Sequence, residues 1–310
     1  MAPEQGMPLP RGLGAGRPEY FKQAQSLRIM QLILVTGLSG SGKSVALRVL
    51  EDSGYYCVDN LPPAMLPDLV GTLRESGQEK VAVSIDARTA ATGRGLTDLP
   101  QYLSGMQRYG VDLRMLFLDA KTETLIKRYS ETRRRHPLDD GTATVPEYIA
   151  REREMLEELH SMAHRIDTSD LRPSTLRDWL LDFLQTERSN LTLVFTSFGF
   201  KLGIPLDADL VFDVRPLPNP YYDPQLRPLS GRDAPVMAYL DAIPAAQEML
   251  ADIGDLVEKW LPAYARDSRH YLTVAIGCTG GQHRSVYFAE QLAARFNQTA
   301  DVLVRHREMK

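Results

Sequence analysis

Apolar and polar positions alternate between two patterns along residues 30–187 of the chain. Short apolar runs predict buried strands, and the stretches of helical spacing between them predict the crossover helices of a parallel sheet. The predicted strands are residues 32–36, 55–58, 81–85, 114–118 and 165–166. The predicted helices are residues 44–53, 67–76, 121–135, 146–163 and 174–185. We therefore expect an α/β domain over residues 30–188.

The pattern changes after residue 190. Residues 191–195, 210–214 and 271–276 are predicted as strands, residues 236–264 as helices with a short proline break, and residues 286–296 as a helix. We expect a second α/β domain over residues 191–310. Residues 1–29 are rich in proline and glycine and have no apolar periodicity. They are expected to be disordered, or to precede a translation start at Met30.

Composition narrows the classes of protein without naming one. A chain of 310 residues with 43% hydrophobic and 25% charged residues is long enough for two domains with a core each. No apolar run approaches the roughly 18 residues of a membrane span, so we expect no membrane partner. Two cysteines in a chain without a signal peptide are typical of the reducing cytoplasm. Because the net charge is −4, a nucleic-acid partner would need a local basic patch.

The first predicted strand and helix enclose the full spacing of a phosphate loop, G-x-x-x-x-G-K-[ST]. Backbone N–H groups of such a loop point at a polyphosphate, and the helix that follows adds the positive end of its dipole. Lys43 is expected to reach the β- and γ-phosphates of ATP or GTP, and the Ser44 hydroxyl to bind Mg²⁺. The expected fold class is thus a P-loop kinase-like parallel sheet domain followed by a second α/β domain. The predicted phosphate-binding residues are Gly37, Leu38, Ser39, Gly40, Ser41, Gly42, Lys43 and Ser44.

Three of the predicted strands are followed by an aspartate, namely Asp59, Asp86 and Asp119. Ligands of an open parallel sheet bind at the carboxyl ends of its strands, so each carboxylate can hold Mg²⁺ through water or orient an attacking water. Asp86 is the first candidate, because V-A-V-S-I-D is the best apolar run that ends in a carboxylate. The other two are interpreted as helix caps or turn formers.

Residues 127–135, K-R-Y-S-E-T-R-R-R, place five basic residues among nine. A solvated helix face is one interpretation of such a run. The other is an arginine-bearing lid, which small nucleotide kinases close over the transferred phosphoryl group. Both interpretations stay open, and the lid candidates are Arg128, Arg133 and Arg134.

A second unit of strand, glycine-rich turn and helix covers residues 271–296. Its loop, C-T-G-G-Q-H-R-S at residues 278–285, is an anion cradle by the same physics as the first. The spacing C-x-x-G-x-x-R-[ST] is also that of cysteine-dependent phosphatases, in which a thiolate attacks and an arginine clamps phosphate oxygens. Those enzymes usually have His before the cysteine, where this chain has Gly277, and nothing in the sequence identifies their general acid. We expect anion binding here, with phosphatase chemistry as the lesser alternative.

Three stretches, in this order, closely resemble the RapZ family of P-loop nucleotide-binding proteins. They are the phosphate loop with the later Y-Y-C-V-D-N-L-P, the stretch F-T-S-F-G-F-K-L-G-I-P-L-D-A-D-L-V-F-D-V-R-P-L-P-N-P at 195–220, and A-I-G-C-T-G-G-Q-H-R-S-V at 275–286. The resemblance implies a kinase-like N-terminal domain that binds and slowly hydrolyses ATP and GTP, and a C-terminal domain with a second ligand site. The family's proposed GTP motif, D-x-R-N, falls on Asp86, Ala87, Arg88 and Thr89, where Thr89 replaces the usual Asn.

Enterobacterial members of that family act as RNase adapters, whose C-terminal domain binds an amino-sugar phosphate and a small RNA. The resemblance places the sugar-phosphate loop on Thr279, Gly280, Gly281, His283 and Arg284. This chain departs from the adapter branch at Leu202, where the adapters have His, and at residues 305–310, where they have a basic tail. Residues 191–310 contain 12 Lys and Arg against 14 Asp and Glu. These departures argue against an RNA-adapter role.

Two classes of function follow from these observations. One is a metabolite-sensing regulatory protein whose nucleotide hydrolysis switches its conformation, and the other is a nucleoside triphosphatase or kinase that acts on a small molecule. We favour the first, because the sequence shows no acceptor pocket for a kinase. The expected partners are a nucleoside triphosphate and a phosphorylated amino sugar or similar metabolite, with a small RNA and a protein as further candidates. A cytoplasmic homo-oligomer is expected.

Overall fold

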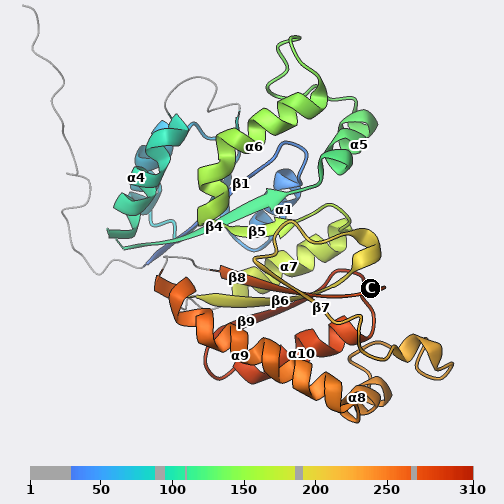
Figure 1. Ribbon diagram of the computed structural model, residues 1–310. Helices are drawn as coiled ribbons and strands as arrows, with labels where there is room; N and C mark the ends of the chain where they lie inside the picture. Colours follow the sequence, from blue (N-terminus) through green and yellow to red (C-terminus); the bar gives the residue numbers. More distant parts are fainter. Residues whose placement is uncertain (1–28, 88–94, 109, 186–190, 267–270, 310) are drawn as a thin grey trace, which may run out of the picture.

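The computed structural model describes residues 29–87, 95–108, 110–185, 191–266 and 271–309. Within these ranges the chain forms two parallel sheets, one in each half of the sequence. Figure 1 shows the two sheets on either side of helix α7 (Pro173–Gln185). The predicted fold class, a P-loop domain followed by a second α/β domain, is confirmed. No helix of the described ranges is long and apolar enough to cross a membrane.

The first sheet has the strand order β2-β3-β1-β4-β5. Its strands are β1 (Met30–Gly37), β2 (Tyr56–Val58), β3 (Lys80–Ser84), β4 (Val111–Asp119) and β5 (His164–Asp167). The central strand β1 pairs with β3 on one side and β4 on the other. The chain leaves β1 toward one side of the sheet and later crosses to the other side, and ligands of such sheets bind at the carboxyl ends beside this reversal.

Helices cover both faces of the first sheet. One core contains residues of α2 (Leu66–Glu75), α4 (Gly95–Arg108), α5 (Thr122–Thr132) and α6 (Val145–Met162), together with the short helix η2 (Pro63–Met65) beside them. The core on the other face contains residues of α1 (Lys43–Asp52) and α7. The sequence pattern did not predict α4, because Pro100 lies inside it and an internal proline normally ends a helix.

The second sheet has the strand order β7-β8-β6-β9. Its strands are β6 (Thr192–Gly199), β7 (Leu210–Asp213), β8 (Tyr271–Cys278) and β9 (Asp301–His306). Three helices, α8 (Ala234–Asp241), α9 (Pro244–Arg266) and α10 (Arg284–Phe296), share one core with this sheet. Short helices η3 (Phe200–Leu202) and η4 (Pro220–Tyr222) lie in the connections. The strand β9 was not predicted, since its basic residues resemble a charged tail.

One helix prediction needs correction, and another is confirmed. The helix predicted over residues 121–135 ends at Thr132, because Arg133 adopts a left-handed conformation with φ 52°. The helices predicted over residues 236–264 with a short proline break are confirmed: they divide between Asp241 and Pro244, and Pro262 lies inside α9. The arginine run is therefore helical at Arg128 and lies outside the helix at Arg133 and Arg134, so these lid candidates have different surroundings.

Candidate functional site

The first loop, residues 37–44, connects β1 to α1 with the geometry of a phosphate cradle. Gly37 has φ +129°, and a Cβ there would lie 2.1 Å from the Leu118 carbonyl oxygen, so this close approach to β4 requires glycine. The Leu38 N–H donates to the same carbonyl at 3.1 Å. Lys43 Nζ folds across the loop and donates to the carbonyl oxygens of Gly37 at 2.6 Å and Leu38 at 3.2 Å. The cation therefore lies over the concave side of the loop, where phosphate oxygens would replace these carbonyls.

A buried acid supports this loop from α6. Ser39 donates to the Glu152 carboxylate through its N–H, at 3.0 and 3.1 Å, and through its hydroxyl at 2.7 Å. His136 Nε2 lies 3.1 Å from Glu152 Oε2, and both side chains are fully buried. Burial raises the pKa of Glu152, but the hydrogen bond to His136, the charge of Lys43 and the bonds from Ser39 together hold it below its ordinary value. The carboxylate is thus charged at neutral pH and fixes the loop.

The three aspartates that follow strands have different partners. Asp119 accepts the Ala120 N–H at 2.7 Å, as a turn former does, and a bond from Arg153 Nη1 at 2.8 Å. Asp59 accepts a bond from the Ser84 hydroxyl. Asp86 is buried, and the amide of Asn60, in the orientation that satisfies both groups, donates to it at 2.9 Å.

Those contacts place Asp86 in the interior at the end of β3, with Ala87 buried beside it. Arg88 and Thr89, from the proposed GTP motif, lie outside the described residues. The Ser44 hydroxyl is exposed at the start of α1, where a phosphate-bound Mg²⁺ would lie. No cluster of three or more His, Cys, Asp or Glu residues suited to a metal occurs among the described residues. A nucleotide-bound Mg²⁺ does not need one, because phosphates and waters supply most of its ligands.

The lid candidates fall into two groups. Arg128 contacts the first loop: its Nη1 donates to the Gly40 carbonyl at 3.0 Å and its Nη2 to the Thr168 carbonyl at 2.6 Å. Arg133 and Arg134 lie beyond the end of α5 and are exposed. Arg128 therefore supports the first loop from α5, whereas Arg133 and Arg134 follow the end of that helix and stay predicted lid residues.

A segment that sequence reasoning missed, D-T-S-D at residues 167–170, follows β5 directly. The Thr168 hydroxyl lies 2.8 Å from the Ser41 carbonyl oxygen, so the segment contacts the first loop. Ser169 and Asp170 line a hollow of about 340 Å³ with residues of α5, among them Lys127 and Arg128. The signal that could have identified the segment is a run of polar residues at the carboxyl end of a buried strand.

The second loop, residues 278–285, connects β8 to α10 around the Cys278 sulfur. The Gly281 N–H donates to Cys278 Sγ at 3.2 Å, and the Ser285 hydroxyl lies 3.2 Å from the same atom. Burial raises the pKa of Cys278, but hydrogen bonds from Ser285, Gly281 and Gly280 outweigh it, so the net pKa lies below the ordinary value. The loop therefore stabilises negative charge at its centre, as an anion cradle should.

The other predicted residues of the second loop also have protein partners. Arg284 Nη1 donates to the carbonyl oxygens of Arg215 at 2.9 Å and Leu217 at 2.6 Å, and its Nη2 lies 3.4 Å from Thr279 Oγ1. His283 Nε2 lies 3.1 Å from the Leu226 carbonyl oxygen. Gly280 and Gly281 form the turn, and Thr279 is exposed at its rim. The structure thus brings the whole predicted set together in one loop, with Arg284 holding the neighbouring segment.

The two domains meet along the carboxyl ends of β5 and β9. The Asp167 carboxylate is fully buried, accepts the Leu206 N–H at 3.1 Å and lies 3.4 Å from Arg307 Nη2. Two residues before Arg307, Arg305 Nη2 lies 2.7 Å from Nε2 of His164, the first residue of β5. Burial lowers the pKa of Arg305 to about 10, which leaves it charged at neutral pH. Both loops therefore lie at the same edge of the two sheets.

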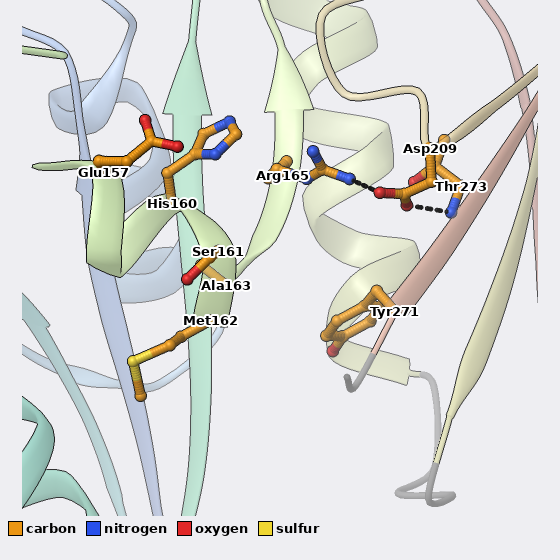
Figure 2. Close-up of a pocket in the computed structure, with 9 residues that line it drawn as sticks. All are labelled: Glu157, His160, Ser161, Met162, Ala163, Arg165, Asp209, Tyr271 and Thr273. Carbon is orange, nitrogen blue, oxygen red and sulfur yellow. Dashed lines mark hydrogen bonds and ion pairs between the residues drawn. The ribbon is translucent and has the colours of Figure 1, made fainter. Parts of the chain in front are cut away.

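The opposite edge has a separate hollow of about 240 Å³ between the domains (Figure 2). His160 and Glu157 of α6 line one side, and Tyr271 of β8 lines the other. Arg165 is ion-paired with Asp209 across the gap. Because this edge is formed by the amino ends of β5 and β8, it is distant from both loops.

Comparison with protein families covers nearly all of the described chain. Residues 30–188 match the family model of the RapZ-like N-terminal domain, and residues 191–310 match that of the RapZ C-terminal domain. A nucleotide-binding protein of Thiobacillus denitrificans is 60% identical over 280 residues, which are 90% of this chain and all of that protein. A nucleotide-binding protein of Aromatoleum aromaticum is 57% identical over 279 residues, 90% of this chain and 94% of the relative.

Solved structures resemble about half of the chain. A shikimate kinase from Bacteroides thetaiotaomicron matches with 16% identity and a TM-score of 0.35, over 50% of this chain and 97% of that one. A sugar kinase from Janibacter sp. matches with 18% identity and a TM-score of 0.35, over 50% of this chain and 94% of that one.

Proposed function

The chain belongs to the RapZ family, and from that premise we propose that it is a regulatory protein that binds and slowly hydrolyses ATP or GTP and senses a phosphorylated metabolite. The observation that carries the proposal is the pair of phosphate cradles at one edge of two joined sheets, one with Lys43 and one with Arg284. A single-function kinase needs only the first of them. The second cradle would bind a separate ligand, and nucleotide binding or hydrolysis at the first cradle could respond to that ligand.

The nucleotide's phosphates would bind the N–H groups of residues 37–44, with Lys43 at the β- and γ-phosphates and Mg²⁺ at Ser44. We place the base in the hollow between α5 and Asp170, because that hollow adjoins the loop through Arg128. A guanidinium plane can stack on a purine, and the carboxylate and Ser169 hydroxyl can bond its edge. Bound Mg²⁺ neutralises developing charge on the transferred phosphoryl group, and Arg133 or Arg134 would add positive charge from the lid.

The second loop would hold the phosphate of an amino sugar or a similar metabolite. Loop N–H groups, the Thr279 hydroxyl and the Arg284 guanidinium are the donors available there, and charge-assisted bonds to phosphate are the strong ones. The hydrogen bonds from Ser285, Gly281 and Gly280, which lower the pKa of Cys278, support an anion site at the centre of this loop. Sulfur occupies that position, so the phosphate would lie above it.

The test uses the full chain and two kinds of ligand. We expect Mg·ATP or Mg·GTP, and separately an amino-sugar phosphate, to raise the thermal midpoint, because each ligand binds only the folded protein. The unphosphorylated sugar should leave the midpoint unchanged. Phosphate release from the nucleotide should be slow and should yield no phosphorylated sugar. A sugar product that contains the γ-phosphate would establish the kinase alternative instead.

A further inference from the structure

The first loop is connected to the domain boundary by one short segment. Thr168, whose hydroxyl lies 2.8 Å from the Ser41 carbonyl oxygen, directly follows Asp167. The Asp167 carboxylate pairs with Arg307 Nη2 at 3.4 Å, and Arg307 Nη1 donates to the Asp167 carbonyl oxygen at 3.2 Å. Arg307 is only 6% exposed and Asp167 is not exposed at all. A shift of Arg307 therefore leaves a buried carboxylate without its cation, which is a costly state.

The same short stretch reaches the second loop on its other side. The Arg307 N–H donates to the Ser197 carbonyl of β6 at 3.2 Å, and the next residue is Glu308. The Glu308 carboxylate packs against Gly281, where φ is +75° and a Cβ would lie 2.2 Å from Glu308 Oε2. Glu308 Oε2 is buried and has no hydrogen-bond partner among the described residues. A buried carboxylate oxygen with no donor is a strained group that responds to a nearby charge.

We propose that Arg307 and Glu308 couple the two loops, so that an anion bound at residues 278–285 weakens nucleotide binding at residues 37–44. The inference rests on the proposed function, since both loops must bind their ligands. An anion on the second loop brings negative charge close to the Glu308 carboxylate and repels it. Because Glu308 adjoins Arg307, its displacement draws Arg307 from Asp167. Thr168, whose hydroxyl bonds to the Ser41 carbonyl of the first loop, is then no longer held in place through Asp167 and Arg307.

Another contact between the domains, made by Lys121, lies near the Arg307–Asp167 pair but is more exposed. Lys121 Nζ donates to the Leu202 carbonyl at 2.6 Å and lies 3.3 Å from Asp170. The Lys121 and Asp170 side chains are 28% and 42% exposed, so water screens their pairing. The buried Arg307 pair cannot exchange its partner for water, and we assign the coupling to it.

The experiment is a double-mutant cycle read by nucleotide affinity, with a fluorescent ATP analogue and Mg²⁺ as the probe. Gly281→Ala places a Cβ against Glu308 and so imitates the displacement. We expect it to weaken nucleotide binding by about fivefold in the otherwise unchanged chain and by less than about twofold when Arg307→Gln is also present. The matched control is Arg165→Gln, which breaks an ion pair between the domains at the opposite edge (Figure 2). Gly281→Ala should keep its full effect in that background.

A second measurement needs no change in the second loop. Addition of Mg·ATP to the otherwise unchanged chain should alter amide hydrogen exchange in residues 278–285, and Arg307→Gln should abolish that response while Arg165→Gln preserves it. Failure of the unchanged chain to bind any nucleotide would overturn the proposed function. Nucleotide binding with no change from Gly281→Ala and no exchange response would overturn the coupling alone. Equal loss of coupling from both arginine variants would show that domain docking in general, not Arg307, transmits it.

Discussion

The first loop at residues 37–44 and the second loop at residues 278–285 share a backbone arrangement but differ in the side chains that surround it. Each follows a buried parallel strand, turns through glycines and begins a helix. In the first, the Lys43 ammonium reaches over the loop and donates to two of its carbonyls, and a buried carboxylate, Glu152, accepts the Ser39 N–H. In the second, the sulfur of Cys278 lies among the N–H groups, and the cation, Arg284, is buried and bonded to backbone carbonyls.

The difference indicates what each loop can do. Lys43 donates to carbonyls of its own loop, which phosphate oxygens could replace, and this arrangement suits hydrolysis. Arg284 is buried and donates to carbonyls of another segment, and this arrangement suits binding without chemistry. We therefore expect the same backbone arrangement to serve turnover in one domain and recognition in the other.

The largest expected effect comes from removing the Lys43 cation. Lys43→Ala should lower ATP and GTP hydrolysis by about a hundredfold or more, because the loop loses its charge on the β- and γ-phosphates. Steady-state phosphate release measures it, and Lys259→Ala on α9 is the matched surface control. Unimpaired turnover in Lys43→Ala would contradict the assignment of the first loop.

The corresponding change in the second loop should act on binding. Arg284→Ala should weaken binding of an amino-sugar phosphate by one or two charge-assisted hydrogen bonds, each worth roughly 1.5 to 3 kcal/mol. Titration calorimetry on the full chain measures it. Arg215→Ala is the control, because Arg215 is exposed and pairs with Asp213 nearby. Equal small losses from both variants would show that Arg284 only supports the loop.

A third prediction separates the two groups of lid arginines. Arg133→Ala should lower kcat by about tenfold or more and change KM little, because a lid residue acts on charge in the transition state. Arg128→Ala should instead raise KM, since Arg128 holds Gly40 and Thr168 beside the nucleotide. Equal small effects from every arginine of residues 127–135 would indicate a solvated helix face.

The two thiols should shift stability in opposite directions with pH. The folded pKa of Cys278 lies below its ordinary value, so its stabilisation is present above the unfolded pKa and is lost as pH falls through the folded pKa. Burial raises the pKa of Cys57 to about 11, so its stabilisation is present below about 8.5 and is lost as pH rises toward 11. Between pH 7 and 9.5, Cys278→Ser should therefore lose stability relative to wild type, and Cys57→Ser should gain it. Urea unfolding under reducing conditions measures both, and shifts of the same sign would contradict the assignment.

The smallest expected effect distinguishes a sensor from a phosphatase. Cys278→Ser should leave the thermal stabilisation by an amino-sugar phosphate nearly unchanged, and wild type should not hydrolyse an aryl phosphate, because a sensor uses the loop and not the thiolate. A phosphatase needs the thiolate as nucleophile. Robust hydrolysis by wild type that disappears in Cys278→Ser would contradict the assignment of the second loop to a sensor.

Local patterns accounted for the strands of the first sheet and for both loops. The apolar runs before residues 37 and 278, and the glycines after them, fix strand, turn and helix over fewer than thirty residues each. The helix end at Arg133 was less accurate, because a left-handed residue depends on neighbours that the pattern does not contain. The roles of the loop residues stay predictions until they are measured.

The sequence by itself therefore determined the fold class, the family and the strand, turn and helix of the two loops, since each depends on a short stretch of chain. Only the tertiary structure decided that Glu152, 113 positions from Ser39, holds the first loop, and that Arg307, 140 positions from Asp167, joins the domains. Such pairs have no local signature, because the free energy of burying a charge depends on which distant partner reaches it. For the same reason Arg128 and Arg133 have different expected roles: both are arginines of one basic run, but their neighbours in the structure differ.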